Sequence, residues 1–183
     1  MPEAPRILAL GLGNILCGDD GFGIHAIERL YAGYEFSANV RVMDGGTQGQ
    51  TLYGPVTEAD CLLVFDAADM GLSPGSLAVR EAEGVPLWLG ARKLSPHQNG
   101  FMEVLALAAL RNALPATRIL IGCQPLRVEF GQSLSDGVRA AIGPAVELGV
   151  ERLRALGAEL RPRCGDEHLV NDEILNSRFM RCR

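Results

Sequence analysis

The chain has 183 residues, of which 48% are hydrophobic and 21% are charged, and its formal net charge is −5. This length and composition predict one globular domain, and the acidic balance argues against nucleic acid or an anionic membrane as a partner. No apolar run reaches the roughly 18 residues of a membrane span, and no signal-peptide pattern is present, so we expect a protein of the cytoplasm. We also expect a monomer. The five cysteines are scattered, and we expect reduced thiols.

The first element is the apolar run Ile7–Leu10, typical of a buried strand, which breaks into Gly11-Leu12-Gly13. A loop with two adjacent carboxylates, Asp19 and Asp20, follows before a helical pattern begins at Ile24. Open α/β sheets bind ligands at the carboxyl ends of their strands, and carboxylate oxygens suit a cation rather than a phosphate. A nucleotide cofactor is not expected, because the third glycine of the dinucleotide fingerprint is absent at its usual spacing.

Two further strands also end in a carboxylate. The strand predicted over 40–43 is followed by Asp44-Gly45-Gly46, so Asp44 is either a third acidic group of a site or an ordinary turn residue. After a short helix predicted over 51–58, the continuous apolar run 61–65 is typical of a central parallel strand, and Asp66 is its first polar residue. A carboxylate in this environment is costly unless it binds a cation, caps a helix or pairs with a basic group. Like Asp20, Asp66 follows the carboxyl end of a predicted strand.

The second half of the chain supplies a histidine for the same site. Residues 77–80 predict a short antiparallel edge strand, because no crossover helix fits between it and the preceding strand. Ser95 is a candidate helix cap with Pro96 at the first helical position, which places His97 in the first turn. An imidazole near strand-end carboxylates is a common metal ligand, so His97 joins the candidate residues.

The remaining elements complete an α/β fold. Residues 117–123 predict the last strong strand, and an amphipathic helix begins at Ser135, within which Pro144 predicts a kink or a restart. We predict a three-layer α/β/α sandwich with a mostly parallel five-stranded sheet and one short antiparallel edge strand. We predict that residues 1–157 form a single α/β catalytic domain and that residues 158–183, which lose the periodicity, form a polar C-terminal tail.

In this architecture Asp20, Asp66 and His97 converge on the carboxyl edge of the sheet. Two oxygens and one nitrogen leave coordination positions open on a divalent metal, and suit nickel or zinc better than magnesium. A structural metal site normally supplies four ligands. We therefore expect this site either to activate water or to borrow ligands from a substrate that brings its own metal.

At these residues the chain resembles the maturation endopeptidases of nickel-iron hydrogenases. The resemblance runs from about residue 6 to residue 157, and its motifs are Gly11-x-Gly13-Asn14, Asp19-Asp20-Gly21-x-Gly23, Asp44-Gly45-Gly46-Thr47, the strand-end Asp66 and Ser95-Pro96-His97-Gln98. It implies that Asp20, Asp66 and His97 form the metal-recognising, catalytic site. It also implies a protease that removes a C-terminal extension from the precursor of the hydrogenase large subunit, after nickel has been inserted. The nickel would be supplied by the substrate.

Several alternatives stay open for the chemistry and for the class of function. Either the nickel, as a Lewis acid, or one of the carboxylates, as a general base, assists the attack of water. A thiol mechanism through Cys17 is disfavoured, because no base is assigned to that residue. A different class of function, a non-proteolytic nickel-sensing chaperone that docks on the hydrogenase precursor, would use the same residues.

Overall fold

A five-stranded sheet forms the centre of the molecule in the computed structural model, which describes residues 4–82 and 96–163. Its strands are β1 (Ile7–Leu12), β3 (Val40–Gly46), β4 (Cys61–Ala67), β5 (Leu77–Ala82) and β6 (Thr117–Cys123). The spatial order is β3-β1-β4-β6-β5; every neighbouring pair is parallel except β5 and β6, which are antiparallel. The predicted fold class is confirmed, including its antiparallel edge strand.

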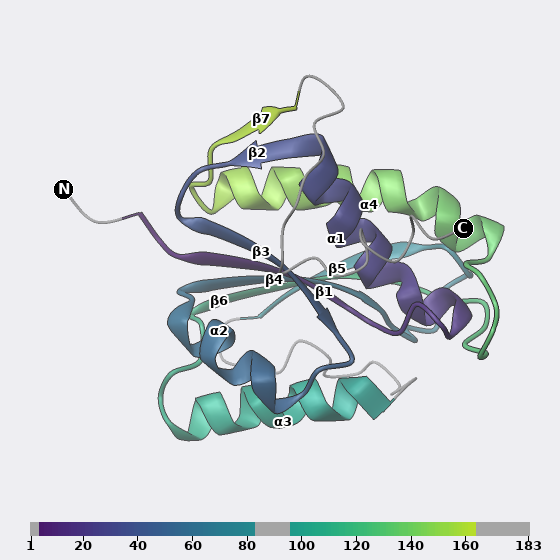
Figure 1. The fold of residues 1–183 in the computed structure, drawn as a ribbon, viewed down its shortest axis with the longest axis horizontal. Coiled ribbons are helices and arrows are strands. Elements are labelled where there is room, and N and C mark those ends of the chain that lie inside the picture. The colour runs from purple at the N-terminus through teal and green to yellow at the C-terminus, as the bar shows by residue number, and fades with distance from the viewer. Residues whose placement is uncertain (1–3, 83–95, 164–183) are drawn as a thin grey trace.

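Helices cover both faces of this sheet (Figure 1). One face carries α1 (Phe22–Gly33) and α4 (Asp136–Ala155), and the other carries α2 (Tyr53–Glu58), preceded by the short 3-10 helix η2 (Gln50–Leu52), and α3 (Pro96–Leu110). Every residue of β4 is buried, as its unbroken apolar run predicts. Phe65 packs in the α1–α4 layer and Val64 in the α2–α3 layer, so β4 stabilises both.

Helix α4 is continuous although Pro144 lies within it. Of the two outcomes that the sequence predicts there, a kink or a restart, the restart is wrong. Proline removes one backbone N–H, but residues on both sides of it, among them Val138 and Leu153, are fully buried in the α1–α4 layer. This packing holds the two halves of α4 on the sheet as a single helix.

A second sheet pairs β2 (Tyr34–Phe36) with β7 (Leu160–Pro162) in antiparallel fashion. The assignment of residues 158–163 to a polar tail is therefore wrong, since Leu160 is buried in the core and the Arg163 guanidinium lies 5.3 Å from the centre of the Tyr31 ring. Strands of three residues are too short to show a periodicity. The rest of the predicted tail, 164–183, lies outside the described residues. No helix in the described ranges combines the length and apolarity needed to cross a bilayer.

Candidate active site

Asp20 lies in the 3-10 helix η1 (Gly18–Gly21), between the end of β1 and the start of α1. Only 1% of the residue is exposed, and its Oδ2 accepts a hydrogen bond of 3.0 Å from the backbone N–H of Asn14. Gly13, with φ of +136°, makes this turn possible, because a Cβ there would lie 1.8 Å from the carbonyl oxygen of Asp20. The glycine and the asparagine of the first motif thus fold the loop around the carboxylate.

Asp66 lies near the carboxyl end of β4 and is completely buried. The side-chain amide of Gln98 donates hydrogen bonds to Asp66 Oδ2, at 3.0 Å, and to the carbonyl oxygen of Ala67, at 2.8 Å. Gln98 is itself 3% exposed and belongs to the first turn of α3. This side chain therefore ties the start of α3 to the candidate carboxylate, a role that the sequence did not predict for Gln98.

His97 directly precedes Gln98, and its backbone lies in the first turn of α3, as predicted. Its side chain, like the predicted cap Ser95, lies outside the described residues. Among the residues whose side chains are described, no three His, Cys, Asp or Glu side chains are placed to hold a metal together. The structure thus brings two of the predicted ligands to one edge of the sheet, and the complete set of three stays a prediction.

Two glycines, Gly11 and Gly23, allow the first turn of α1, which follows the Asp20 loop, to pack closely against β1 and β4. A Cβ on Gly23 would lie 2.2 Å from the carbonyl oxygens of both Leu12 and Phe65, and a Cβ on Gly11 would lie 2.5 Å from the carbonyl oxygen of Gly23. These distances are far shorter than real Cβ atoms allow, so the first turn of α1 approaches β1 and β4 only because both positions are glycine. Phe65 immediately precedes Asp66, and the same contact therefore brings the two carboxylate-bearing segments together.

Asp19, the neighbour of Asp20, has a structural role. Its carboxylate accepts four hydrogen bonds, from the backbone N–H groups of Leu126, Arg127 and Ser135 and from the Ser135 hydroxyl, at 2.6–3.2 Å. Burial acts to raise the pKa of this carboxyl, but the four bonds together outweigh it and hold the pKa below its ordinary value. Asp19 thus fastens the loop after β6 and the start of α4 to the Asp20 loop.

Asp44 lies on the other side of the sheet. Because side chains alternate along a strand, it shares a face with Val42, in the α1–α4 layer, whereas Asp66 contacts α3. Its Oδ1 accepts a hydrogen bond of 2.8 Å from the N–H of Gly46. Burial raises the pKa of Asp44, and burial together with the nearby Asp44 raises the pKa of Glu28 in α1 to about 7. Of its two predicted roles, the geometry supports the turn residue.

A cavity at the opposite edge of the sheet is separate from this site. It has a volume of about 190 Å³ and is lined by residues at the amino ends of β1 and β3, including Arg6, Asn39 and Arg41. Arg6 is paired with Asp60 at 2.9 Å, and Arg41 lies 3.9 Å from Glu58. Their charges are compensated, and parallel sheets bind ligands at the carboxyl edge, so we do not assign a function to this cavity.

Comparison with known proteins identifies one family. The sequence model of the family described as "Hydrogenase maturation protease" matches residues 24–152, which is more than half of the chain. The chain is similar to the hydrogenase expression/formation protein HupM of Azotobacter chroococcum, with 46% identity over 179 residues, 97% of this chain and 86% of that protein. It is also similar to the hydrogenase 2 maturation protease of Escherichia coli, with 36% identity over 86% of this chain and 96% of that protein.

Solved structures agree with this result. The hydrogenase maturating endopeptidase HybD from E. coli superposes with a TM-score of 0.80 and 36% identity, covering 86% of this chain and 98% of that one. The HybD protease from Thermococcus kodakarensis gives a TM-score of 0.66 at 30% identity, covering 80% of this chain and 98% of that one. The arrangement of sheet and helices that positions Asp20 and Asp66 is therefore shared with structures of this kind.

Proposed function

The chain belongs to the hydrogenase maturation protease family, and on this basis we propose that it is an endopeptidase that removes the C-terminal extension from the nickel-loaded precursor of a nickel-iron hydrogenase large subunit. The observation that carries the proposal is the pair of buried carboxylates, Asp20 and Asp66, on two segments held together at the carboxyl edge of the sheet. Parallel α/β sheets bind their ligands at this edge.

The proposal makes nickel part of the substrate. Asp20, Asp66 and His97 would contact the ion with two oxygens and one nitrogen, a set that suits a divalent first-row metal. Such a set leaves positions for ligands that the precursor itself brings. A precursor without the ion would lack the feature that these side chains bind, so cleavage would depend on nickel insertion.

The reaction is hydrolysis of one peptide bond. A water oxygen attacks the carbonyl carbon, the C–N bond breaks, and the water proton is passed to the departing amine. A buried carboxylate favours this step as a general base that accepts the proton from water; the substrate's nickel favours it by polarising the carbonyl. Both routes need Asp66 in the position that Gln98 gives it.

The proposal is tested with purified precursor, prepared with and without nickel, incubated with the protein and analysed by mass spectrometry. We expect the nickel-loaded precursor to be shortened once, near its C-terminus, and the nickel-free precursor to stay intact. The Asp66→Asn and His97→Ala variants should each process at least about 100-fold more slowly. Asp60→Asn is a matched control, because Asp60 directly precedes the same strand, at the opposite edge of the sheet.

Each part of the proposal has its own contrary result. If the protein forms a stable complex with the precursor and leaves it uncut, it is a nickel-sensing chaperone and not a protease. Efficient cleavage of nickel-free precursor would remove the metal from the recognition step. Full activity of Asp66→Asn or His97→Ala, with Asp60→Asn equally active, would remove that residue from the site.

A further inference from the structure

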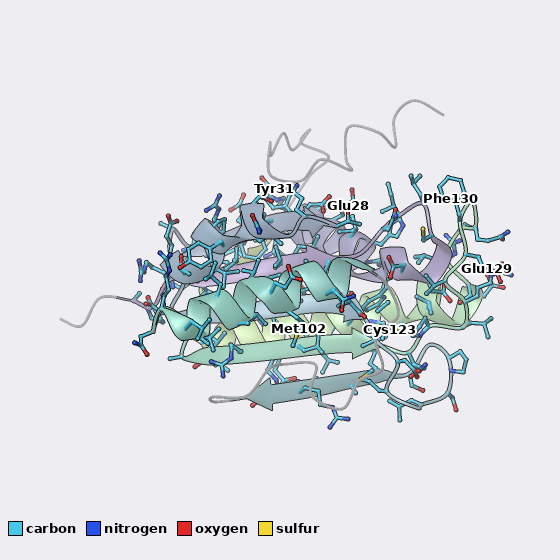
Figure 2. The ribbon with its side chains drawn as sticks, turned by 90° about the horizontal axis from the view of Figure 1, so that it is seen from below. Glu28, Tyr31, Met102, Cys123, Glu129 and Phe130 are labelled. Carbon is cyan, nitrogen blue, oxygen red and sulfur yellow. The ribbon has the colours of Figure 1, made fainter. Side chains whose placement is uncertain are left out.

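Two loops beside the candidate site expose large apolar side chains. Leu16, on the loop after β1, is 56% exposed, and Leu126 and Phe130, on the loop after β6, are 61% and 79% exposed, with Ile15 at 36% beside them. We call these four residues the apolar rim. They make up four of the seven exposed large hydrophobic residues in the described part of the chain. Figure 2 shows Phe130 and its neighbour Glu129 at one end of the molecule.

Backbone hydrogen bonds join the two loops that carry the rim. The N–H of Gly131 donates to the carbonyl oxygen of Leu16 at 2.7 Å, and the N–H of Gly18 donates to the carbonyl oxygen of Gln132 at 3.1 Å. Asp19 adds the hydrogen bonds to residues 126 and 127 described above. Leu16 and Phe130 therefore belong to one fixed surface, and their exposure is set by well-bonded backbone.

The rim also shares its backbone with the candidate site. Leu16 lies four residues before Asp20, and the N–H of Leu126 is bonded to the side chain of Asp19 at 2.9 Å. The apolar side chains therefore lie on the loop that carries Asp20 and on the loop bonded to it. Charged, exposed side chains, Arg127 and Glu129, lie between the apolar ones. An apolar centre with polar neighbours is the usual composition of a protein–protein contact.

We propose that the apolar rim is the docking surface for the protein substrate, where apolar side chains of the precursor next to its metal-bearing chain end bind. This inference rests on the proposed function for the identity of the substrate. The occupant is the precursor because the rim is continuous with the loop that carries Asp20. The rim binds substrate and takes no part in the chemical step.

The test compares a rim variant with a matched surface variant. The rim variant combines Leu16→Ser, Leu126→Ser and Phe130→Ser; the control is Leu110→Ser, because Leu110 is 82% exposed but lies at the other end of α3 from Gln98. KM and kcat are measured on nickel-loaded precursor, and thermal unfolding verifies that both variants are folded. We expect KM of the rim variant to rise by about tenfold or more at unchanged kcat, and the control to match the wild type.

A binding measurement separates this proposal from the proposed function. The Kd of the precursor is measured for Asp66→Asn with and without the rim substitutions, so that docking is read even if no cleavage occurs. If Asp66→Asn binds the precursor with the same Kd with and without the rim substitutions, the rim is not a docking surface. Cleavage by the wild type would then still support the protease. Tighter binding by the rim variant would show that the chain's own residues cover the rim. Loss of a wild-type dimer at unchanged Kd would assign the rim to a second copy; either result overturns the proposal.

Discussion

Replacing Asp19 with Asn should damage the fold, whereas the same change at Asp20 should damage only the reaction. Asp19 Oδ2 accepts three hydrogen bonds and Oδ1 accepts one, from the N–H of Ser135 at 2.6 Å. An asparagine oxygen at the Oδ2 position keeps three of the bonds in uncharged form, but its amide then faces the Ser135 N–H. One buried donor without an acceptor costs about 1–3 kcal/mol, and three weakened bonds add about 0.5–1 kcal/mol each.

The sum is a loss of about 2.5–6 kcal/mol in the free energy of unfolding, or roughly 5–24 °C in Tm for a chain of this size. Urea and thermal unfolding at neutral pH measure this loss. The matched control is Asp136→Asn, an acid in the first turn of α4 that is exposed. We expect Asp20→Asn to keep Tm within a few degrees of the wild type while processing falls.

The pH dependence of the same variant provides a second check. The folded-state pKa of Asp19 lies below its ordinary value of 3.8, so the ionised carboxylate contributes stability above that pH and loses it as the pH falls through the folded-state pKa. The gap in stability between wild type and Asp19→Asn should therefore be full near neutral pH and close in acid. A variant as stable as the wild type at neutral pH would refute the assignment of Asp19 as the fastening residue.

Two further predictions concern buried polar groups. Gln98→Leu should reduce processing by about 10- to 100-fold, because Asp66 loses the donor that orients it. Gln98→Glu places a second carboxylate beside Asp66, which raises the pKa of the pair. The acid limb of the pH–rate profile should therefore shift to higher pH. An unshifted profile with Gln98→Glu would contradict this role. Glu28, whose pKa is raised to about 7 by burial and by Asp44, contributes stability that is present below about pH 4.5 and is lost as the pH rises through 7. Glu28→Gln should remove that loss, which is on the order of 2 kcal/mol once the shift is discounted for the partial exposure of Glu28. The free energy of unfolding, measured for both proteins between pH 4.5 and 8, checks this, and parallel curves would argue against it.

Most of the central sheet could be predicted because three of its strands, β1, β4 and β6, are almost entirely buried. An unbroken apolar run such as 61–65 is too short for a typical helix and has no polar face, so it indicates a central strand, and the short gap before β5 excludes a parallel crossover. The pair β2 and β7 was missed for the opposite reason. Each has three residues and exposes part of its surface, so neither leaves a pattern that differs from a loop.

Of the candidate site, only the residues that follow the ends of strands could be predicted from the sequence. The positions of Asp20 and Asp66 follow from the rule that ligands bind at the carboxyl edge. That rule does not tell the structural role of Asp19 from the candidate catalytic role of Asp20, because the hydrogen-bond donors that hold Asp19 lie more than 100 residues away in the chain. Strand alternation, in contrast, was available for Asp44, since it places that side chain on the face of Val42 rather than toward α3. The contact between Gln98 and Asp66 is tertiary and has no local sequence pattern.

Because of the close approach at Gly23, the stability of the protein and its choice of substrate should respond to different mutations. Main-chain atoms of α1, β1 and β4 set the spacing of the segments that carry the two carboxylates, since the three atoms nearest a Cβ on Gly23 all belong to the backbone of Leu12 or Phe65. Exchanges of one apolar residue for another within the two core layers should therefore alter how firmly the protein holds together, with little influence on which substrates it accepts. The core of this protein is thus open to engineering for thermal tolerance, provided that Gly11 and Gly23 are left as they are.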